Sequence, residues 1–161
     1  MAGKSSGLII GEFRRTVDDR YRLIIPPQLA EPITRESVEC TLVKERAGCL
    51  SLWSRTEWER RFAGRIQLIE QRLSLGDLDR RLAEVQMLGR LLSTRHKPVE
   101  LAGRNRLVIP EGFREFLGAE PNAEVMLIGA AVCVEIWKRE QWLHYLNRRA
   151  ARFTRLFARL S

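Results

Sequence analysis

Cysteine, histidine and lysine are scarce in this chain, and the first two scarcities exclude whole classes of site. Three of the 161 residues are cysteines (Cys40, Cys49 and Cys133) and two are histidines, His96 and His144. No two cysteines have the CxxC spacing of a metal or redox site, so we expect buried thiols in a reducing compartment and no metal. We also find no nucleophile with a matched base and no phosphate-binding loop. The chain is therefore predicted not to be an enzyme, and to have no cofactor and no small-molecule substrate.

Long apolar runs are also missing. No run approaches the ~18 residues that a membrane span needs, and residues 1–7 lack the apolar region of a signal peptide. The hydrophobic content of 45% and charged content of 30% are typical of a soluble globular protein. We therefore expect a cytoplasmic protein without a membrane partner, made of one domain or of two small repeats that share a core.

The charge is strongly biased towards arginine. The formal net charge is +8, and only Lys4, Lys44, Lys97 and Lys138 of the 28 basic residues are lysines. The planar guanidinium group suits phosphates and guanine edges better than an ammonium group does. With a sequence pI of about 10.2, the chain has the charge expected of a protein with a polyanionic partner, although charge alone does not identify one.

An internal repeat is the most informative feature of the sequence. The stretch from Val17 to Pro26 aligns with the stretch from Leu101 to Pro110, an offset of 84 residues. The same offset relates Cys49 to Cys133, Trp53 to Trp137 and Trp58 to Trp142. A constant offset through two tryptophans and a cysteine indicates a tandem duplication.

Each repeat has the same predicted order of elements. A first strand precedes a charged turn, a short apolar strand, a short helix opened by proline, a hairpin and a longer helix. The predicted fold class is therefore α+β. The expected ranges are strands over Leu8–Phe13 and Leu23–Ile25 with a helix from Gln28, and strands over Pro98–Leu101 and Leu107–Ile109 with a helix from Gly112.

The hairpin of the first repeat predicts a register and a core. A loop over Glu45–Gly48 would place Val43 opposite Leu50, and Thr41 opposite Leu52. These four residues would form one apolar core face, shared with Val125, Leu127, Val134 and Ile136 of the second repeat. Cys40 would then face Trp53, which argues against a disulfide with Cys49.

Helices are expected after each hairpin. Ser54 and Glu57 form a capping box, followed by an apolar stripe of Trp58, Phe62, Ile66, Ile69 and Leu73. After a break at 74–77, a second helix uses Leu78, Leu82, Val85 and Leu92. The last helix is predicted from about Arg139 to the chain end, with an apolar stripe opposite an arginine stripe. The apolar stripe is Leu143, Leu146, Ala150, Phe153, Phe157 and Leu160, and the arginine stripe is Arg148, Arg152, Arg155 and Arg159.

Asp18 and Arg22, followed by an apolar strand and Pro26, resemble the DxxxR signature of the MraZ family of transcriptional regulators. The duplication and the helix starts at Glu57-Trp58 and Gln141-Trp142 resemble that family too. The resemblance implies two tandem AbrB-like swapped-hairpin β units that form a fused pseudo-twofold barrel. It also implies ring-shaped homo-oligomers, association with the nucleoid, and binding to double-stranded DNA at promoter repeats of the division and cell-wall gene cluster.

The resemblance divides the chain into four parts. The first SpoVT/AbrB-like repeat is expected over 8–54 and the second over 96–138, with connecting helices over 55–95 and a basic amphipathic helix over 139–161.

The predicted DNA-binding residues are arginines in and beside the two motif loops, because an arginine on a short loop can reach a base edge or a phosphate. They are Arg14, Arg15, Arg20, Arg22, Arg104 and Arg106, with Asp18 as a residue that braces the first loop. An alternative for Asp18 and Arg22 is that they pair across the turn and only hold it. An equal hypothesis for Arg20 and Arg104 is a solvated charge, and the C-terminal arginines more simply form a solvated helix face.

The sequence departs from the family pattern in both loops. Tyr21 and Asn105 stand where the family usually has glycine before the motif arginine, and Ala102 stands at the position of Asp18. Two alternatives follow: a ring-forming assembly protein that does not bind DNA, and an antitoxin-like protein whose last helix wraps a partner.

Overall fold

The computed structural model describes residues 7–73 and 77–161, and for residues 77 and 78 the backbone alone. The fold is of the predicted α+β class. Its strands are β1 (Glu12–Thr16), β2 (Arg22–Ile24), β3 (Glu39–Arg46), β4 (Cys49–Ser54), β5 (His96–Glu100), β6 (Arg106–Val108), β7 (Glu124–Gly129) and β8 (Val134–Lys138). Its helices are α1 (Pro27–Thr34), α2 (Arg55–Arg72), α3 (Asp77–Arg80), α4 (Leu82–Arg95), α5 (Glu111–Leu117), α6 (Arg139–Arg149), the 3-10 turn η1 (Ala150–Arg152) and α7 (Phe153–Leu160).

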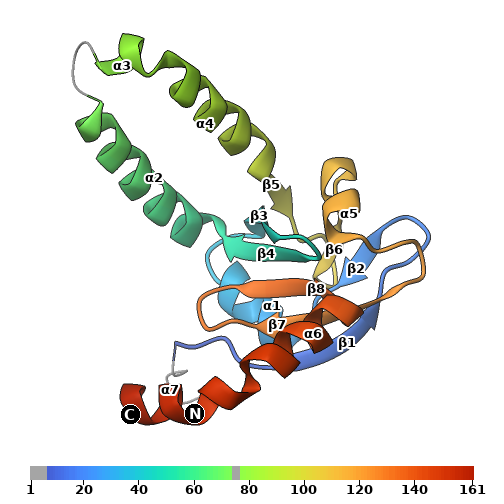
Figure 1. Ribbon diagram of the computed structural model, residues 1–161. Coiled ribbons are helices and arrows are strands. Elements are labelled where there is room, and N and C mark those ends of the chain that lie inside the picture. The colour runs from blue at the N-terminus through green and yellow to red at the C-terminus, as the bar shows by residue number, and fades with distance from the viewer. Residues whose placement is uncertain (1–6, 74–76) are drawn as a thin grey trace.

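The strands form one antiparallel sheet and one short ribbon. Six strands pair in the order β1-β7-β8-β4-β3-β5, and β2 pairs with β6 separately. Within the described parts of the chain the six-stranded sheet is open, with β1 and β5 at its edges, so the predicted closed barrel is not found there. Figure 1 shows the ribbon beside the sheet.

The two repeats exchange strands. The first strand of each repeat pairs with the hairpin of the other, β1 with β7 and β5 with β3. In the ribbon, Leu23 lies opposite its repeat equivalent Leu107, and in the sheet Ser51 lies opposite its equivalent Glu135. Equivalent residues meet at both places, as they would in two repeats related by a twofold rotation.

The predicted register of the first hairpin is wrong by one residue. Val43 lies opposite Ser51 and Thr41 opposite Trp53. The turn is the two residues 47–48 rather than the predicted four, and a bulge between Lys44 and Arg46 offsets part of the resulting shift. Gly48 has a φ of +81°, and a β-carbon there would lie 2.5 Å from Gln141, so this turn position requires glycine.

The shift changes which side chains face the core. Leu50 and Leu52 are fully buried in it as predicted, but the β3 residues in the same core are Cys40 and Leu42 instead of Thr41 and Val43. Cys40 lies opposite Ser54, not Trp53, and all three cysteines are buried and free. The core also contains the predicted residues of the second repeat: Val125, Leu127, Val134 and Ile136.

Several helix starts agree with the sequence. Both short helices begin directly after a proline, Pro26 or Pro110, and the Ser54 hydroxyl accepts a hydrogen bond of 3.2 Å from the Glu57 N–H at the start of α2. The first strand was predicted too early, since Leu8–Phe13 contains only an isolated bridge at Ile9 before β1 begins.

The long helices differ more from the prediction. Most of the break expected at 74–77 lies outside the described residues. The second helix is interrupted at Arg81 and continues to Arg95, beyond Leu92, the last residue of its predicted apolar stripe. The C-terminal helix was predicted to be continuous, but η1 divides it into α6 and α7.

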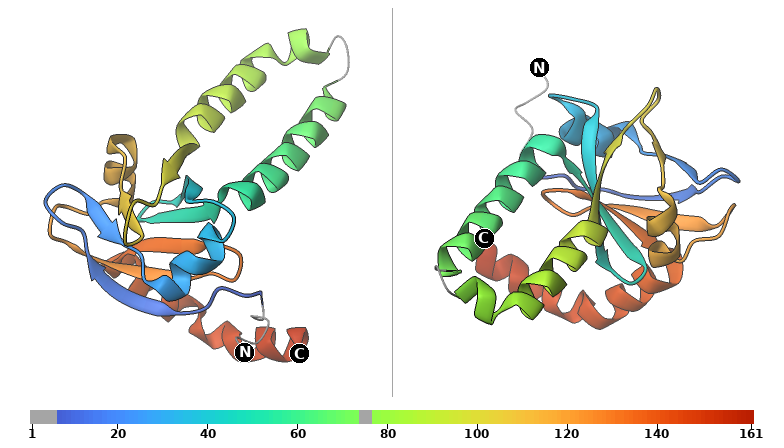
Figure 2. Two further views of the ribbon diagram at one scale, coloured as in Figure 1. Left: turned by 180° about the vertical axis from the view of Figure 1, so that it is seen from behind. Right: turned by 90° about the horizontal axis from the view of Figure 1, so that it is seen from above.

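The helices form two arms on different sides of the sheet. In Figure 1, α2 and α4 project above the sheet, whereas α6 and α7 lie below it. The view from behind in Figure 2 agrees. Among the described residues, no helix is both long and apolar enough to span a membrane.

Candidate nucleic-acid interface

The two predicted DNA-binding loops are turns that precede the ribbon strands. The first turn covers residues 17–21 between β1 and β2, and the second covers 101–105 between β5 and β6. Each turn is held by the other repeat: the Ile25 N–H donates to the Asn105 carbonyl at 2.9 Å, and the Ile109 N–H donates to the Tyr21 carbonyl at 2.9 Å. Seen from above in Figure 2, both turns point away from α2 and α7.

The first turn is organised by the Asp18 carboxylate. Its Oδ1 accepts hydrogen bonds of 2.8 Å from the backbone N–H groups of Arg20 and Arg22, and its Oδ2 accepts one of 2.6 Å from Arg22 Nε. The Arg22 backbone N–H contributes most to holding the pKa of Asp18 below its usual 3.8, against a smaller opposing effect of burial. The ion pair is 37% exposed on both sides, so the Arg22 guanidinium is fixed in direction but still reaches the surface.

The second turn closes without the acid and with a different backbone, since two of its residues are left-handed against one in the first turn. Ala102 has no side-chain acceptor, and the Arg106 N–H donates instead to the Ala102 carbonyl at 3.2 Å, while the Ala102 N–H donates to the Arg106 carbonyl at 2.9 Å. The backbone alone therefore closes this turn.

The family glycine position has the backbone conformation that glycine favours. Tyr21 and Asn105 both have a φ of 58°, and Arg104 has a φ of 65°. Asparagine tolerates this left-handed region, whereas tyrosine is strained there. The Tyr21 ring packs beneath the Arg114 guanidinium, whose carbon lies 4.1 Å from the ring centre, and this contact offsets part of the strain.

The ribbon brings two motif arginines to one surface. Arg22 lies opposite Val108, and Ile24 lies opposite Arg106. Because side chains alternate along a strand, these four residues share the face opposite the buried Leu23–Leu107 pair. Ile24 and Val108 are 51% and 48% exposed, so two large apolar side chains lie between the two arginines.

Ile24 and Val108 were missed by the sequence reasoning, which considered only charged residues. The signal was present as a period-2 pattern, Arg-Leu-Ile in one repeat and Arg-Leu-Val in the other, with leucine as the buried residue.

The remaining predicted arginines lie around the ribbon rather than on it. Arg20 and Arg104 are exposed within the turns. Arg14 and Arg15 are consecutive on β1 and so point to opposite faces of the strand. Arg14 pairs with Glu124 at 3.4 Å, and Arg15 donates to the Arg14 carbonyl at 2.8 Å, so the structure does not bring these two onto the ribbon surface.

The cysteines do not offer a nucleophile. Burial raises the pKa of Cys40 to about 11 and that of Cys133 to about 12, and burial likewise raises the pKa of Cys49. All three thiols are thus neutral near pH 7. In the described ranges there is also no group of three or more His, Cys, Asp or Glu side chains that could hold a metal ion.

Comparison with known proteins gives one family. The family model described as "MraZ protein, putative antitoxin-like" matches residues 95–161. The chain is 29% identical over 144 residues to the transcriptional regulator MraZ of Heliobacterium modesticaldum, covering 89% of this chain and 90% of that protein. It is 29% identical over 138 residues to the transcriptional regulator MraZ of Syntrophomonas wolfei, covering 86% of each, and 26% identical over 149 residues to that of Desulforamulus reducens, covering 92% and 94%.

Proposed function

We propose that this chain, which is similar over most of its length to MraZ transcriptional regulators, is itself a transcriptional regulator that binds double-stranded DNA in a sequence-specific way. The observation that carries the proposal is the outer face of the β2–β6 ribbon, where Arg22 and Arg106 lie on either side of Ile24 and Val108. The target that the family implies is a set of promoter repeats in the division and cell-wall gene cluster, including the regulator's own promoter.

The ribbon suits the major groove of DNA. That groove admits a two-stranded β-ribbon, and arginine can bind both acceptors of guanine there. Ile24 and Val108, which are about half exposed, offer apolar contact to thymine methyl groups. The braced Arg22 is the candidate for the guanine contact, and the unbraced Arg106 is the candidate for a phosphate contact beside it.

The other predicted arginines are proposed as phosphate contacts. Arg20 and Arg104 lie in the turns beside the ribbon, and Arg14 lies on the neighbouring edge strand β1. Arg15 is the weakest candidate, because its guanidinium contacts the Arg14 carbonyl and the Phe13 ring. Such contacts fix orientation and carry no sequence information.

For the architecture, we propose two fused swapped-hairpin units of the AbrB-like kind, with the repeats at 8–54 and 96–138. The exchange of first strands between the hairpins supports this division, as do the pairing of Leu23 with Leu107 and that of Ser51 with Glu135. The connecting helices at 55–95 and the basic segment at 139–161 would then be additions that project from the shared unit.

The protein is further proposed to act without catalysis, as a ring-shaped homo-oligomer associated with the nucleoid in the cytoplasm. The regulator names of its relatives support a role without catalysis, and the two exposed arms leave room for contacts between copies.

The test is a titration of the purified full chain against its own upstream DNA and against random DNA, at several salt concentrations. We expect tighter binding to the upstream DNA, and a log–log slope of about −0.9 for each phosphate neutralised. The double variant Arg22→Ala/Arg106→Ala should lose the preference for upstream DNA while keeping weak binding to both. An affinity that is the same for both DNAs and flat with salt contradicts the proposal.

A further inference from the structure

Tyr21, the residue directly before Arg22, has a backbone conformation that its own side chain disfavours. Its φ of 58° lies in the left-handed region, where a β-carbon comes too close to a carbonyl oxygen. Its carbonyl accepts the Ile109 N–H at 2.9 Å, and the next backbone N–H, that of Arg22, donates to Asp18 Oδ1 at 2.8 Å. A rotation of the peptide between Tyr21 and Arg22 would break both hydrogen bonds. The direction of Arg22 therefore depends on Tyr21 keeping this conformation.

Arg114 of helix α5 contacts both residues of the link between the repeats. Its guanidinium carbon lies 4.1 Å from the centre of the Tyr21 ring, and its Nε donates to the Ile109 carbonyl at 2.8 Å. Because the Ile109 N–H donates to the Tyr21 carbonyl, the three residues form a closed set of contacts. The Tyr21 and Arg114 side chains are both half-buried, and a cation over a ring binds more strongly where water is limited.

The corresponding positions of the second turn hold different residues. By the offset of 84 residues, Asn105 corresponds to Tyr21 and Ala30 to Arg114. Asn105 has the same φ of 58°, but asparagine enters the left-handed region more readily than tyrosine does. Ala30 is fully buried in the core and has no group that could hold a turn. The strained residue and the guanidinium thus occur together, as we expect if the guanidinium holds the strained residue.

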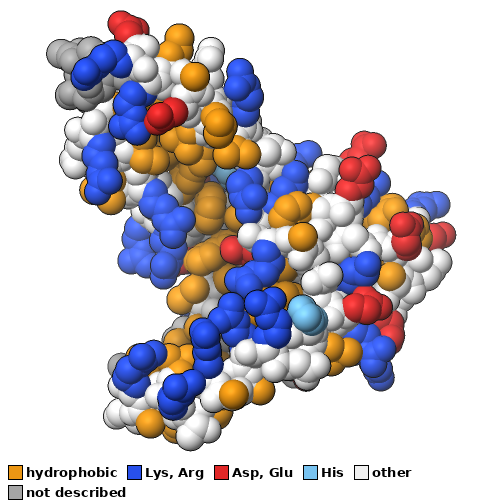
Figure 3. Space-filling model, in the orientation of Figure 1, with side chains coloured by type: hydrophobic (Ala, Val, Ile, Leu, Met, Phe, Trp, Pro, Cys, Tyr) orange, Lys and Arg blue, Asp and Glu red, His pale blue; other side chains and the backbone are white. Residues whose placement is uncertain are grey.

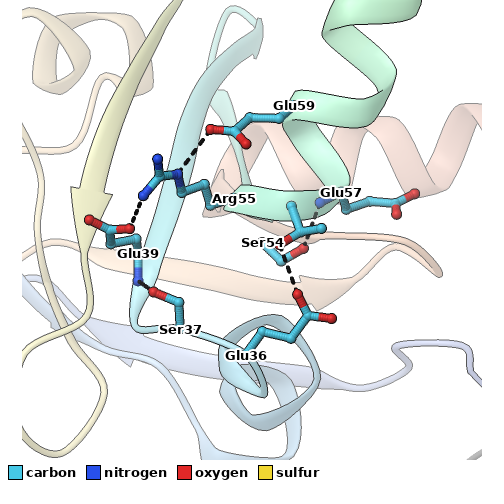
Figure 4. A network of polar contacts seen from close by, with 8 residues as sticks. Glu36, Ser37, Glu39, Ser54, Arg55, Glu57 and Glu59 are labelled. Atoms are coloured by element: carbon cyan, nitrogen blue, oxygen red, sulfur yellow. Dashed lines mark hydrogen bonds and ion pairs between the residues drawn. The ribbon is translucent and has the colours of Figure 1, made fainter.

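Arg114 differs from arginines of the other helices in what holds it. Figure 4 shows Arg55 at the start of α2, whose guanidinium lies between the carboxylates of Glu39 and Glu59. Those ion pairs neutralise Arg55. A carbonyl and a ring hold Arg114, and these contacts fix its direction without cancelling its charge. A phosphate contact is therefore the alternative role for Arg114 that an experiment has to separate.

Basic side chains extend well beyond the motif turns. Figure 3 shows Lys and Arg side chains along both helical arms on the face in view. The phosphates of DNA would find attractive charge at many places on such a surface, and phosphate contacts carry no sequence information. Sequence recognition at the first turn must then depend on how well Arg22 is directed rather than on added charge.

We propose that Arg114 is a positioning residue for DNA recognition: it holds Tyr21 in the left-handed conformation, and Tyr21 in turn keeps Arg22 directed for a base contact. This inference rests on the proposed function, in which Arg22 contacts guanine, and it adds a residue from outside both motif turns. Arg114 is needed because residue 21 has a β-carbon, so glycine at this position would remove the need for it.

The test is a double-mutant cycle on the full chain, made of Arg114→Ala, Tyr21→Gly and the double variant. Fluorescence anisotropy measures the affinity for upstream and for random DNA at two salt concentrations. Arg114→Ala should lower the affinity for upstream DNA by about fivefold to tenfold, the low end of the loss of one base contact, and leave the affinity for random DNA and the salt slope unchanged. Tyr21→Gly should keep the preference for upstream DNA. In that chain, Arg114→Ala should change neither affinity by more than about twofold.

Hydrogen exchange measures the same restraint without DNA. The backbone amides of Arg22 and Ile109 should exchange faster in Arg114→Ala than in the original chain, because the peptide before Arg22 becomes free to rotate. Their exchange should not differ between Tyr21→Gly and the double variant. Arg114→Met, which keeps a long apolar stem, should give the same results as Arg114→Ala and retains the packing of α5 if the alanine variant is less stable.

Three control variants accompany the cycle. Arg65→Ala removes one exposed cation from α2, the helix from which the motif turns point away, and should leave both affinities unchanged. Asn105→Gly introduces glycine at the equivalent position of the other turn, and its effect should simply add to that of Arg114→Ala. Tyr21→Phe keeps the ring under the guanidinium and should behave like the original chain.

Three outcomes overturn the positioning role. Equal losses of affinity for both DNAs with a reduced salt slope, whatever residue stands at position 21, would make Arg114 a phosphate contact. Loss of preference in Tyr21→Phe would assign the DNA contact to the tyrosine hydroxyl. Amide exchange that is unchanged in Arg114→Ala would show that Arg114 does not hold the turn. If exchange rises as expected but the original chain does not prefer upstream DNA, the proposed function fails, and the role in recognition fails with it, while the restraint on Tyr21 stands.

Discussion

In the first motif turn, the Arg22 guanidinium is tied to Asp18 at 2.6 Å, whereas in the second turn the position of that acid holds Ala102. The two turns nevertheless share a left-handed residue before the motif arginine and a carbonyl that accepts from the other repeat. They reach these features differently, because Asp18 holds the backbone of the first turn and backbone groups alone close the second. Asp18 also restricts the Arg22 side chain, so the turns differ in how far they fix their arginines.

The largest expected effect is on stability, and it tests the buried ribbon pair that the two repeats share. Leu23 and Leu107 are both 0% exposed and lie opposite each other in the ribbon. Leu23→Ala and Leu107→Ala should each lower the free energy of unfolding by about 2–5 kcal/mol, and by similar amounts, because each removes the same buried contact. Urea unfolding followed by circular dichroism measures this. A much smaller loss in one variant would mean that the repeats do not share the ribbon equally.

The next effect is on DNA binding, and it tests the difference between the braced Arg22 and the unbraced Arg106. Arg22→Ala should cost about 1–3 kcal/mol in binding to the specific DNA and reduce sequence preference, because a braced arginine loses little freedom on contacting a base. Arg106→Ala should weaken binding to all sequences alike and reduce the salt slope by about one unit. Fluorescence anisotropy on upstream and random DNA at two salt concentrations separates these outcomes. If the two variants behave identically, the difference between the two turns has no effect on DNA binding.

The smallest effect comes from the brace itself, because water competes for a partly exposed carboxylate. The pKa of Asp18 is lowered in the folded state, so its ionised form stabilises the fold above the usual pKa of 3.8, and this contribution is lost as the pH falls through the lower folded-state pKa. Asp18→Asn should therefore lower the melting temperature at pH 6 but not at pH 2. Asp19→Asn, one position along the exposed turn, is the control. A difference that persists at pH 2 would show that the brace does not act through its charge.

The repeats could be predicted from the sequence because the duplication preserves large, distinctive residues at one offset. Helix starts were readable because prolines and a serine cap act locally. The register of the first hairpin was not readable, because both faces of β3 are apolar. Thr41 and Val43 are as buried as a core face would be, at 5% and 7% exposure, so the pattern could not decide between the two registers.

The candidate site was only partly predictable for a related reason. The motif arginines could be located by position, but their common surface depends on β2 pairing with β6 from the other repeat. Pairing between segments so far apart in the chain cannot be predicted from the local sequence pattern. The same holds for the division of the C-terminal helix at η1, where the sequence from Arg149 to Arg152 contains no proline or glycine to mark it.

The exchange of first strands also sets the order in which the protein can be completed during synthesis. Residue 12 in β1 pairs with residue 128 in β7, so the first strand leaves the ribosome 116 residues before its partner exists. At a translation rate of about 5–20 residues per second, the nascent chain holds an unpaired β1 for on the order of ten seconds. The first repeat is then complete as a sequence, but its opening strand has no partner until β7 has been synthesised.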